Sequence, residues 1–466
     1  MSDSLQKIEF SGDEKGALSG SAVFVTLIAM LVVSTVAFGS VDVWAVGINA
    51  VFAGLLIIFW TINAWTKREF QFNPSALQIP MLGLLVIGLI QLLPLRNLNF
   101  STELLSTPAI GSLSLAPYQT LLTVIQLVIF FVFFAAAQTF ISNEERLRRT
   151  IVVIVAFGSL MAFFGILQHL GSASAIYGLR PSAQAVPFAS FVNRHHFAAF
   201  MEMTIGLTLG LLFGKKAVKS DKRIFLLIAI VIMGIAIVLT SSRGGMLSLL
   251  AVVIFVVTIN LRQKADDEAG VDGETDGGRR GKIISVGGAI LLLLILFGSV
   301  LLLGGDESLM RGIGMGAVGD ISTGRFHFWQ IGWRIFLDHP ILGAGFDAFG
   351  TVFPGYDSRN GIFRVEQTHN DYLQTLADGG ILGFACVAAF IFLLFRKSRA
   401  VIGKASDRFG RSAATGALAG CFGILIHSFF DFPLRTSSNM FFFLTLVVIA
   451  TNLIAPRKAS RQRRIQ

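Results

Sequence analysis

The chain of 466 residues is 54% hydrophobic and only 14% charged, and its mean hydropathy is +0.72. Soluble globular proteins average about 25% charged residues, so this composition excludes that class and indicates an integral membrane protein. The formal net charge is +10, and its meaning depends on where the basic residues lie along the chain.

Apolar runs recur along the chain, and each is long enough to cross about 30 Å of hydrocarbon as an α-helix. The runs are continuously apolar, whereas strands of a membrane barrel would alternate over about ten residues. The sequence therefore predicts an all-α integral membrane protein with about twelve transmembrane helices. The predicted spans are Ser19–Phe38, Trp44–Trp65, Ser75–Leu95, Tyr118–Phe140, Thr150–Leu170, His195–Gly214, Ile224–Thr240, Gly244–Leu261, Ile283–Leu303, Leu373–Phe395, Ala413–Phe430 and Ser438–Ile454.

The basic residues give the orientation of these spans. If the N-terminus is inside, 28 of the 38 Lys and Arg residues fall in the two terminal segments and in alternate loops. This asymmetry predicts that both termini and these loops are cytoplasmic. The basic residues border the spans and face anionic membrane lipids. This distribution explains the net charge, so no nucleic acid partner is expected.

All ten basic residues on the predicted outer side are arginines. Arginine stays charged and can hold phosphate or carboxylate oxygens through two parallel hydrogen bonds. The outer face therefore suggests an anionic ligand, although such arginines can also cap helices or pair with nearby acidic residues. The ten are Arg96, Arg180, Arg194, Arg243 and Arg435 together with Arg311, Arg325, Arg334, Arg359 and Arg364 in the long loop Gly304–Tyr372.

Two short outer segments place polar residues at the ends of spans. The segment Thr240–Gly245 joins two spans with almost no loop, and it puts Arg243 at the hydrocarbon edge, where an unpaired charge is costly. Arg243 should have a defined partner, or its side chain extends to the lipid headgroups. The segment Asn193–Phe197 opens another span with His195, and Glu202 follows within the membrane, where it must be paired or line a cavity.

The long outer loop contains one predicted helix, Ser322–Asp338, capped by Ser322 or Thr323 and ended by Pro340. Its aromatic residues recur at helical spacing, which favours packing on the membrane surface or against the spans and holds Arg325 near the headgroups. The glycine-rich stretch that follows, Leu342–Gly350, is not preceded by a strand and predicts tight turns instead of a dinucleotide site.

Histidine and carboxylate residues gather near the ends of two later spans. His369 can exchange a proton near neutral pH, and Asp371 and Glu366 are close enough in sequence to orient or charge it. A histidine at this position could instead serve only as a helix cap. His427, Asp431 and Arg435 are spaced by four residues, but Pro433 argues against one continuous helix and favours satisfied pairing at a helix end.

Four short motifs resemble those of the O-antigen ligase and O-antigen polymerase superfamily of bacterial envelope glycosyltransferases. They lie in one order around one large outer loop, and the resemblance covers residues 192–439. The motifs are Ser-Ser-Arg-Gly-Gly around Arg243, Gly-Arg followed by a tryptophan at Arg325, the run Asp-His-Pro-Ile-Leu-Gly-Ala-Gly from Asp338, and Thr-His-Asn-Asp-Tyr-Leu around His369.

The resemblance implies a multi-pass protein of the bacterial inner membrane. Such a protein transfers a glycan from undecaprenyl diphosphate to an acceptor hydroxyl, without a metal or another cofactor. By resemblance, Arg243 and Arg325 would stabilise the departing diphosphate and His369 would be the general base. We expect four more outer residues to contact substrate: Arg194, His195, Asp371 and Arg435.

The acceptor separates the branches of the superfamily, because a ligase uses lipid A-core and a polymerase uses another lipid-linked glycan. Two stretches, 191–197 and 427–435, look similar to members from exopolysaccharide systems. A secondary transporter is the alternative from another class. That class predicts polar groups near the bilayer midplane and two halves of the chain that are related by an internal repeat. In this sequence the polar groups gather at the predicted outer rim, and no internal repeat is recognised.

The predicted organisation has five parts, and the first 190 residues carry no recognised motif. The parts are a cytoplasmic segment (1–18), nine transmembrane helices (19–303), a periplasmic loop domain (304–372), three transmembrane helices (373–455) and a basic cytoplasmic tail (456–466).

Overall fold

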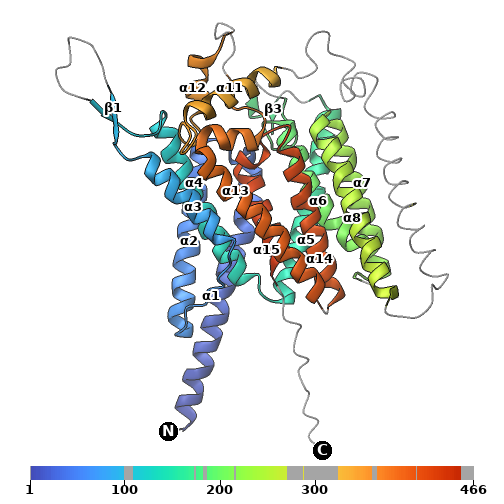
Figure 1. Cartoon of the computed structure of the whole chain (residues 1–466). Helices are drawn as coiled ribbons and strands as arrows, with labels where there is room; N and C mark the ends of the chain where they lie inside the picture. Colours follow the sequence, from blue (N-terminus) through green and yellow to red (C-terminus); the bar gives the residue numbers. More distant parts are fainter. Residues whose placement is uncertain are drawn as a thin grey trace, which may run out of the picture.

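The computed structural model describes residues 2–98, 109–172, 175–181, 186–214, 217–269, 287, 324–358, 365–405 and 407–452. Within these ranges the protein is an all-α bundle, with nine helices long and apolar enough to cross a membrane. The predicted fold class is therefore confirmed. The bundle is drawn upright in Figure 1, with the start of α1 at its lower end.

Eleven of the twelve predicted spans coincide with helices, and the predicted span Ile283–Leu303 lies outside the described residues. The helices that coincide with predicted spans are α1 (Ser2–Val36), α2 (Val43–Lys67), α3 (Gln78–Gln91), α4 (Pro117–Phe140), α5 (Glu144–Leu170), α6 (Arg194–Phe213), α7 (Ser220–Leu239), α8 (Arg243–Ala269), α13 (Asp371–Lys404), α14 (Arg408–His427) and α15 (Ser437–Thr451).

Two of these helices, α3 and α15, are shorter than the rest, with 14 and 15 residues. A helix rises 1.5 Å per residue, so each is only about 21–23 Å long. The sequence predicted that the α3 span would continue to Leu95. The helix ends earlier because Pro94 disfavours helical backbone in the residue before it.

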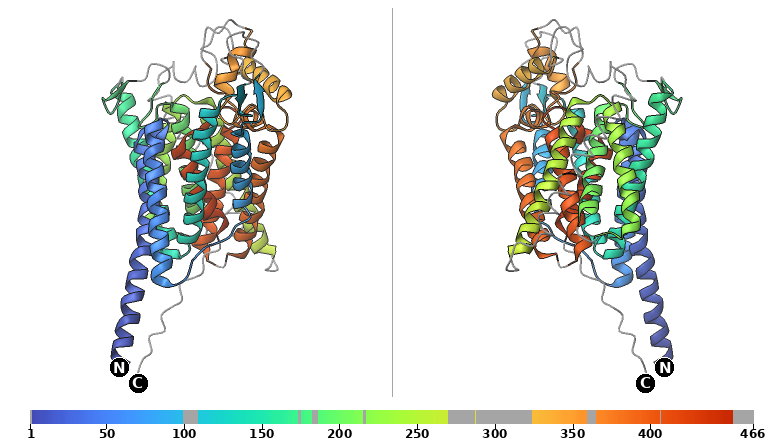
Figure 2. Two further views of the ribbon diagram at one scale, coloured as in Figure 1. Left: turned by 90° about the vertical axis from the view of Figure 1, so that its left-hand side faces the viewer. Right: turned by 90° about the vertical axis from the view of Figure 1, so that its right-hand side faces the viewer.

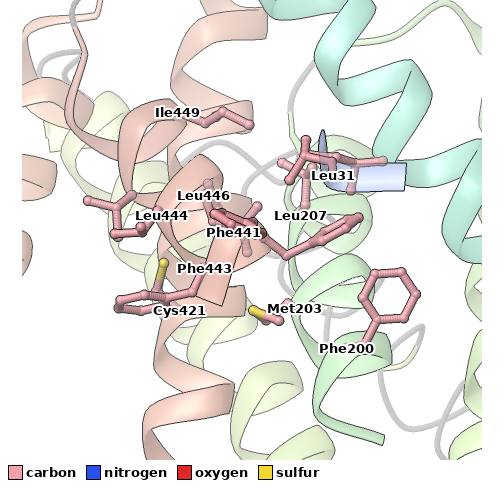
Figure 3. Close-up of a cluster of buried hydrophobic side chains, with 14 of the residues drawn as sticks. Leu31, Phe200, Met203, Leu207, Cys421, Phe441, Phe443, Leu444, Leu446 and Ile449 are labelled. Atoms are coloured by element: carbon pink, nitrogen blue, oxygen red, sulfur yellow. The ribbon is translucent and has the colours of Figure 1, made fainter. Parts of the chain in front are cut away.

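The centre of the bundle is the packing of α6 against α14, the most extensive helix pair among the described residues. Glycines allow the two backbones to touch, since a Cβ added to Gly210 would lie 2.3 Å from the Cα of Gly416. Small residues at a crossing point are the usual way for membrane helices to approach closely. Apolar side chains of α1 and α15 complete this core (Figure 3).

Two short helices, α11 (Arg325–Asp338) and α12 (Phe349–Tyr356), lie at the upper end of the bundle, above α13 (Figures 1 and 2). Residues 304–323 and 359–364 of the predicted loop domain lie outside the described part of the chain, including the predicted caps Ser322 and Thr323. The described helix begins at Arg325, after Gly324 with φ +83°, and it ends before Pro340 as predicted.

The connection between α11 and α12 is anchored to the bundle by buried polar contacts. The side chain of Gln91 donates to the carbonyl oxygens of Leu342 and Asp378, at 2.6 and 2.9 Å, and accepts from the backbone N–H of Phe346. Gly343 has φ +71° and touches the backbone of α13, so the tight turns predicted for this stretch are confirmed.

The remaining described elements are short and lie in connections between spans. They are the 3₁₀ turns η1 (Phe38–Ser40) and η2 (Pro433–Arg435) and two hairpins, β1 (Arg96–Leu98) with β2 (Ala109–Gly111) and β3 (Ala175–Ile176) with β4 (Arg180–Pro181). Both hairpins are antiparallel, with Asn97 opposite Ile110 and Ala175 opposite Pro181.

Candidate active site

His369 lies just before the first residue of α13 and is held in an uncommon backbone conformation, with φ +56°. The helix cap is the next residue, Asn370, whose side chain accepts from the N–H groups of Tyr372 and Leu373. His369 is therefore not the cap of this helix. A non-glycine residue in this region is strained and is typical of functional sites.

The imidazole of His369 is paired with the buried carboxylate of Asp431. Its Nδ1 lies 3.1 Å from Oδ1 of Asp431, and the ring of Phe432 packs edge-on at 4.9 Å. Asp431 follows the end of α14, so the partner comes from 62 residues further along the chain. The carboxylate seen against the His369 ring is thus Asp431, whereas the sequence had pointed to Asp371 and Glu366 by proximity, because contacts in the fold bring distant residues together.

Asp431 also brings Arg325 to the site, because Nη2 of Arg325 lies 3.9 Å from its Oδ2. Burial alone would raise the pKa of the Asp431 carboxyl, but the hydrogen bond from His369 and the neighbouring histidines hold that pKa well below its usual range. Asp431 is therefore an anion at neutral pH. It can fix the orientation of the His369 ring and stabilise a positive charge on it.

The turn that leads into α8 ends just before Arg243 and is joined to α6. Ser241 has φ +52°, and Oγ of Ser242 lies 2.8 Å from Nδ1 of His195 and accepts from the N–H of Gly245 at 3.1 Å. The nearly loop-free connection between the two spans is confirmed, because α7 ends at Leu239 and Arg243 is the first residue of α8.

A second histidine–carboxylate pair lies deeper in the bundle. Nδ1 of His427, the last residue of α14, lies 2.8 Å from Oε1 of Glu202 on α6, and both side chains are buried. The His427 ring also packs on Gly244, where an added Cβ would meet it at 3.0 Å. The prediction that Glu202 is paired or lines a cavity is confirmed by this pairing.

Arg435 lies on η2 and forms ion pairs with three carboxylates. Its guanidinium is 2.9 Å from Asp347 and from Asp378, and 3.9 Å from Asp371. Burial alone would lower the pKa of Arg435, but these carboxylates outweigh burial and raise it. His427, Asp431 and Arg435 therefore each have separate partners, and no continuous helix joins them, because α14 ends at His427 and Pro433 begins the separate turn η2.

The structure arranges the predicted site residues in three groups. Arg325 and His369 meet at Asp431, His195 lies beside the Arg243 turn, and Arg435 and Asp371 lie together. Arg194 is the first residue of α6, and its backbone N–H donates to the carbonyl oxygen of Val186. The sequence did not identify the pairing of Asp431 with His369, although the spacing of Asp431 from His427 had drawn attention to it.

Comparison with known families agrees with this arrangement of motifs. A comparison with curated proteins gives no match. A family model described as O-antigen ligase matches residues 228–388, a segment that contains Arg243, Arg325 and His369. The matched segment is therefore similar to the O-antigen ligase family, which its motifs also resemble.

Proposed function

We propose that this protein is an O-antigen ligase-like transferase that moves a glycan from undecaprenyl diphosphate to an acceptor hydroxyl. The observation that carries the proposal is the set formed by His369, Asp431 and Arg325 at one outer edge of the bundle. A histidine fixed by a buried carboxylate is suited to proton abstraction, and a nearby arginine is suited to a departing diphosphate.

In the proposed step, the acceptor oxygen forms a bond to the anomeric carbon of the donor sugar while the bond from that carbon to the diphosphate oxygen breaks. The Nδ1 of His369 is engaged by Asp431, which leaves Nε2 to take the hydroxyl proton. The imidazolium that results is stabilised by Asp431 and can release its proton to water, because His369 is partly exposed. Arg243 and Arg325 would stabilise the charge that develops on the diphosphate.

The direct test uses the purified chain in nanodiscs with a polyprenyl-diphosphate-linked glycan and a glycan acceptor. The proposal predicts that free polyprenyl diphosphate and the extended acceptor appear in equal amounts. Release of the diphosphate without any glycosylated product would contradict it. Uptake of the glycan into sealed vesicles, with no bond formed, would support transport instead.

A polymerase that extends lipid-linked repeats is the second candidate. The two stretches that look similar to exopolysaccharide members come together at this site, where the ring of His196 packs edge-on against that of Phe432 with ring centroids 4.8 Å apart. A surface-glycan gel of a deletion strain distinguishes the candidates. Loss of all polymer from lipid A-core indicates a ligase, whereas retention of a single repeat indicates a polymerase.

The proposed chemistry requires the site to face the periplasm, with both termini in the cytoplasm. The exposed residue Ser358, which follows α12, offers a position to test this orientation. A cysteine replacing Ser358 is expected to react with an impermeant maleimide in cells whose outer membrane alone is permeabilised. The matched control is the parent chain, whose Cys421 is buried and whose Cys386 lies in α13. Labelling that needs a broken inner membrane would reverse the orientation.

A further inference from the structure

A cavity of about 430 Å³ lies beside the proposed active site, between α3, α4, α13 and α15. Its depth is lined by apolar side chains of α3, α4, α13 and α15, among them Leu84, Leu127, Val387 and Phe443. Its polar end, called the mouth below, is lined by Asp347, Asp371, Asp378 and Arg435. A cavity of this size with an apolar body and a few polar groups at one end is typical of a site for a small amphipathic molecule.

The cavity lies on the side of His369 away from the Arg243 turn. Phe432 lines it, and the Phe432 ring packs against His369 at 4.9 Å and against His196 at 4.8 Å. Neither Arg243 nor Arg325 lines the cavity, and α8 packs on α6, α7 and α14. Figure 1 shows α7 and α8 on one flank of the bundle and α3 and α4 on the other. A ligand in the cavity would thus approach His369 from the side opposite the proposed diphosphate site.

The charges at the mouth disfavour an anionic headgroup. Three carboxylates, Asp347, Asp371 and Asp378, line it together with the single guanidinium of Arg435. With all four ionised, three negative charges and one positive charge leave an excess of two negative charges. Arg435 is already bound to these carboxylates, so a phosphate placed there would meet like charge at short range.

Unpaired polar atoms at the mouth indicate a hydroxyl-bearing ligand instead. His196 is 5% exposed, and its Nε2 has no hydrogen-bond partner among the described residues, although its Nδ1 is paired with Thr436. The side-chain oxygen of Gln367 is likewise buried and unpaired within the described chain. Buried polar atoms are normally satisfied, and sugar hydroxyls can both donate and accept.

We propose that this cavity binds the acceptor as a glycolipid, with an uncharged sugar at the mouth and an apolar chain between α3, α4, α13 and α15. The inference rests on the proposed transferase function, because that function supplies the reason for a hydroxyl to approach His369. An acceptor with a phosphate between its apolar chain and its first sugar would place that phosphate beside the three carboxylates, so this placement does not fit a diphosphate-linked acceptor. Donor and acceptor then meet at His369 from opposite flanks of the bundle.

Two photoreactive probes with the same dodecyl chain test the proposal on the full chain in nanodiscs. One is dodecyl maltoside and the other is dodecyl phosphate, each with a diazirine on the chain. We expect the maltoside to label peptides that contain Leu84, Leu127 or Val387, and the phosphate to label them about fivefold less or weaker still, because like charge disfavours it. Equal or stronger labelling by the phosphate would overturn the proposal.

A matched pair of variants on α3 tests the location. Leu84 lines the cavity, whereas Leu82 is exposed on the outside of the same helix. Leu84→Trp should lower maltoside labelling by about tenfold, and Leu82→Trp should change it by less than about twofold. Leu127→Trp on α4 repeats the test if Leu84→Trp does not accumulate. Unchanged labelling in folded variants of both cavity positions would overturn the assignment.

Inhibition kinetics test whether the ligand of the cavity is the acceptor. In the transfer assay, dodecyl maltoside should compete with the acceptor and leave the apparent donor affinity unchanged. Competition with the donor would contradict the assignment. If the chain shows no transferase activity at all, the labelling results still decide whether the cavity binds a neutral glycolipid, so the two failures are distinguishable.

Discussion

Two histidine–carboxylate pairs lie at the end of the bundle where α13 begins and α14 ends, and they differ mainly in access to solvent. In the His369–Asp431 pair the histidine side chain is 30% exposed, whereas in the Glu202–His427 pair both side chains are at most 1% exposed. Only the first pair has Arg325 within 4 Å of its carboxylate. Similar residues therefore acquire different roles, since a proton donor or acceptor must reach the substrate whereas a sealed pair can only hold helices together.

The largest expected effect is on turnover, at the exposed pair. His369→Ala should lower turnover by about a thousandfold, because general base catalysis contributes on the order of 10²–10⁴. Donor affinity should change by less than about twofold, since the diphosphate contacts lie elsewhere. Turnover and donor binding are measured on the same purified nanodisc samples. Normal turnover per folded molecule would remove His369 from the mechanism.

The sealed pair should show the opposite pattern. Glu202→Gln keeps the shape of the side chain but breaks the buried ion pair, which should cost about 3 kcal/mol of unfolding free energy. Turnover per folded molecule should remain close to that of the parent. Chemical denaturation and the transfer assay, applied to one preparation, give both quantities. A stable Glu202→Gln protein with greatly reduced turnover would mean that the two pairs do not differ in role.

The two candidate diphosphate-binding arginines, Arg243 and Arg325, test whether charge or hydrogen-bond geometry matters for transfer. Arg243→Lys and Arg325→Lys keep the positive charge but lose the planar guanidinium. Each should lower transfer about tenfold or more, which corresponds to about 1.4 kcal/mol of transition-state stabilisation. Arg180→Lys is the matched control, because Arg180 is also an outer arginine but is paired with Asp42 on the α1–α2 connection. Parental rates in both site variants, at equal protein levels, would eliminate the diphosphate assignment.

The sequence predicted the helices well because each span is a continuous apolar run that depends little on its neighbours. It overestimated α3, where Pro94 limits the helix. The motifs also identified Arg243, Arg325 and His369 as candidates. Their partners were not predictable, because Asp431 is 62 residues from His369 and Glu202 is 225 residues from His427. Such pairs form only when helices distant in sequence pack together, as the glycines of α6 and α14 permit.

The central claim is that Asp431 acts through His369, and a double-mutant cycle tests it most directly. Turnover is measured for the parent, His369→Ala, Asp431→Asn and the double variant, with folding checked for each. Residues that act as one unit are strongly non-additive. If Asp431 acts through His369, the double variant should be no slower than His369→Ala, within about twofold. Losses that simply multiply would show that Asp431 and His369 act independently, and would contradict the account.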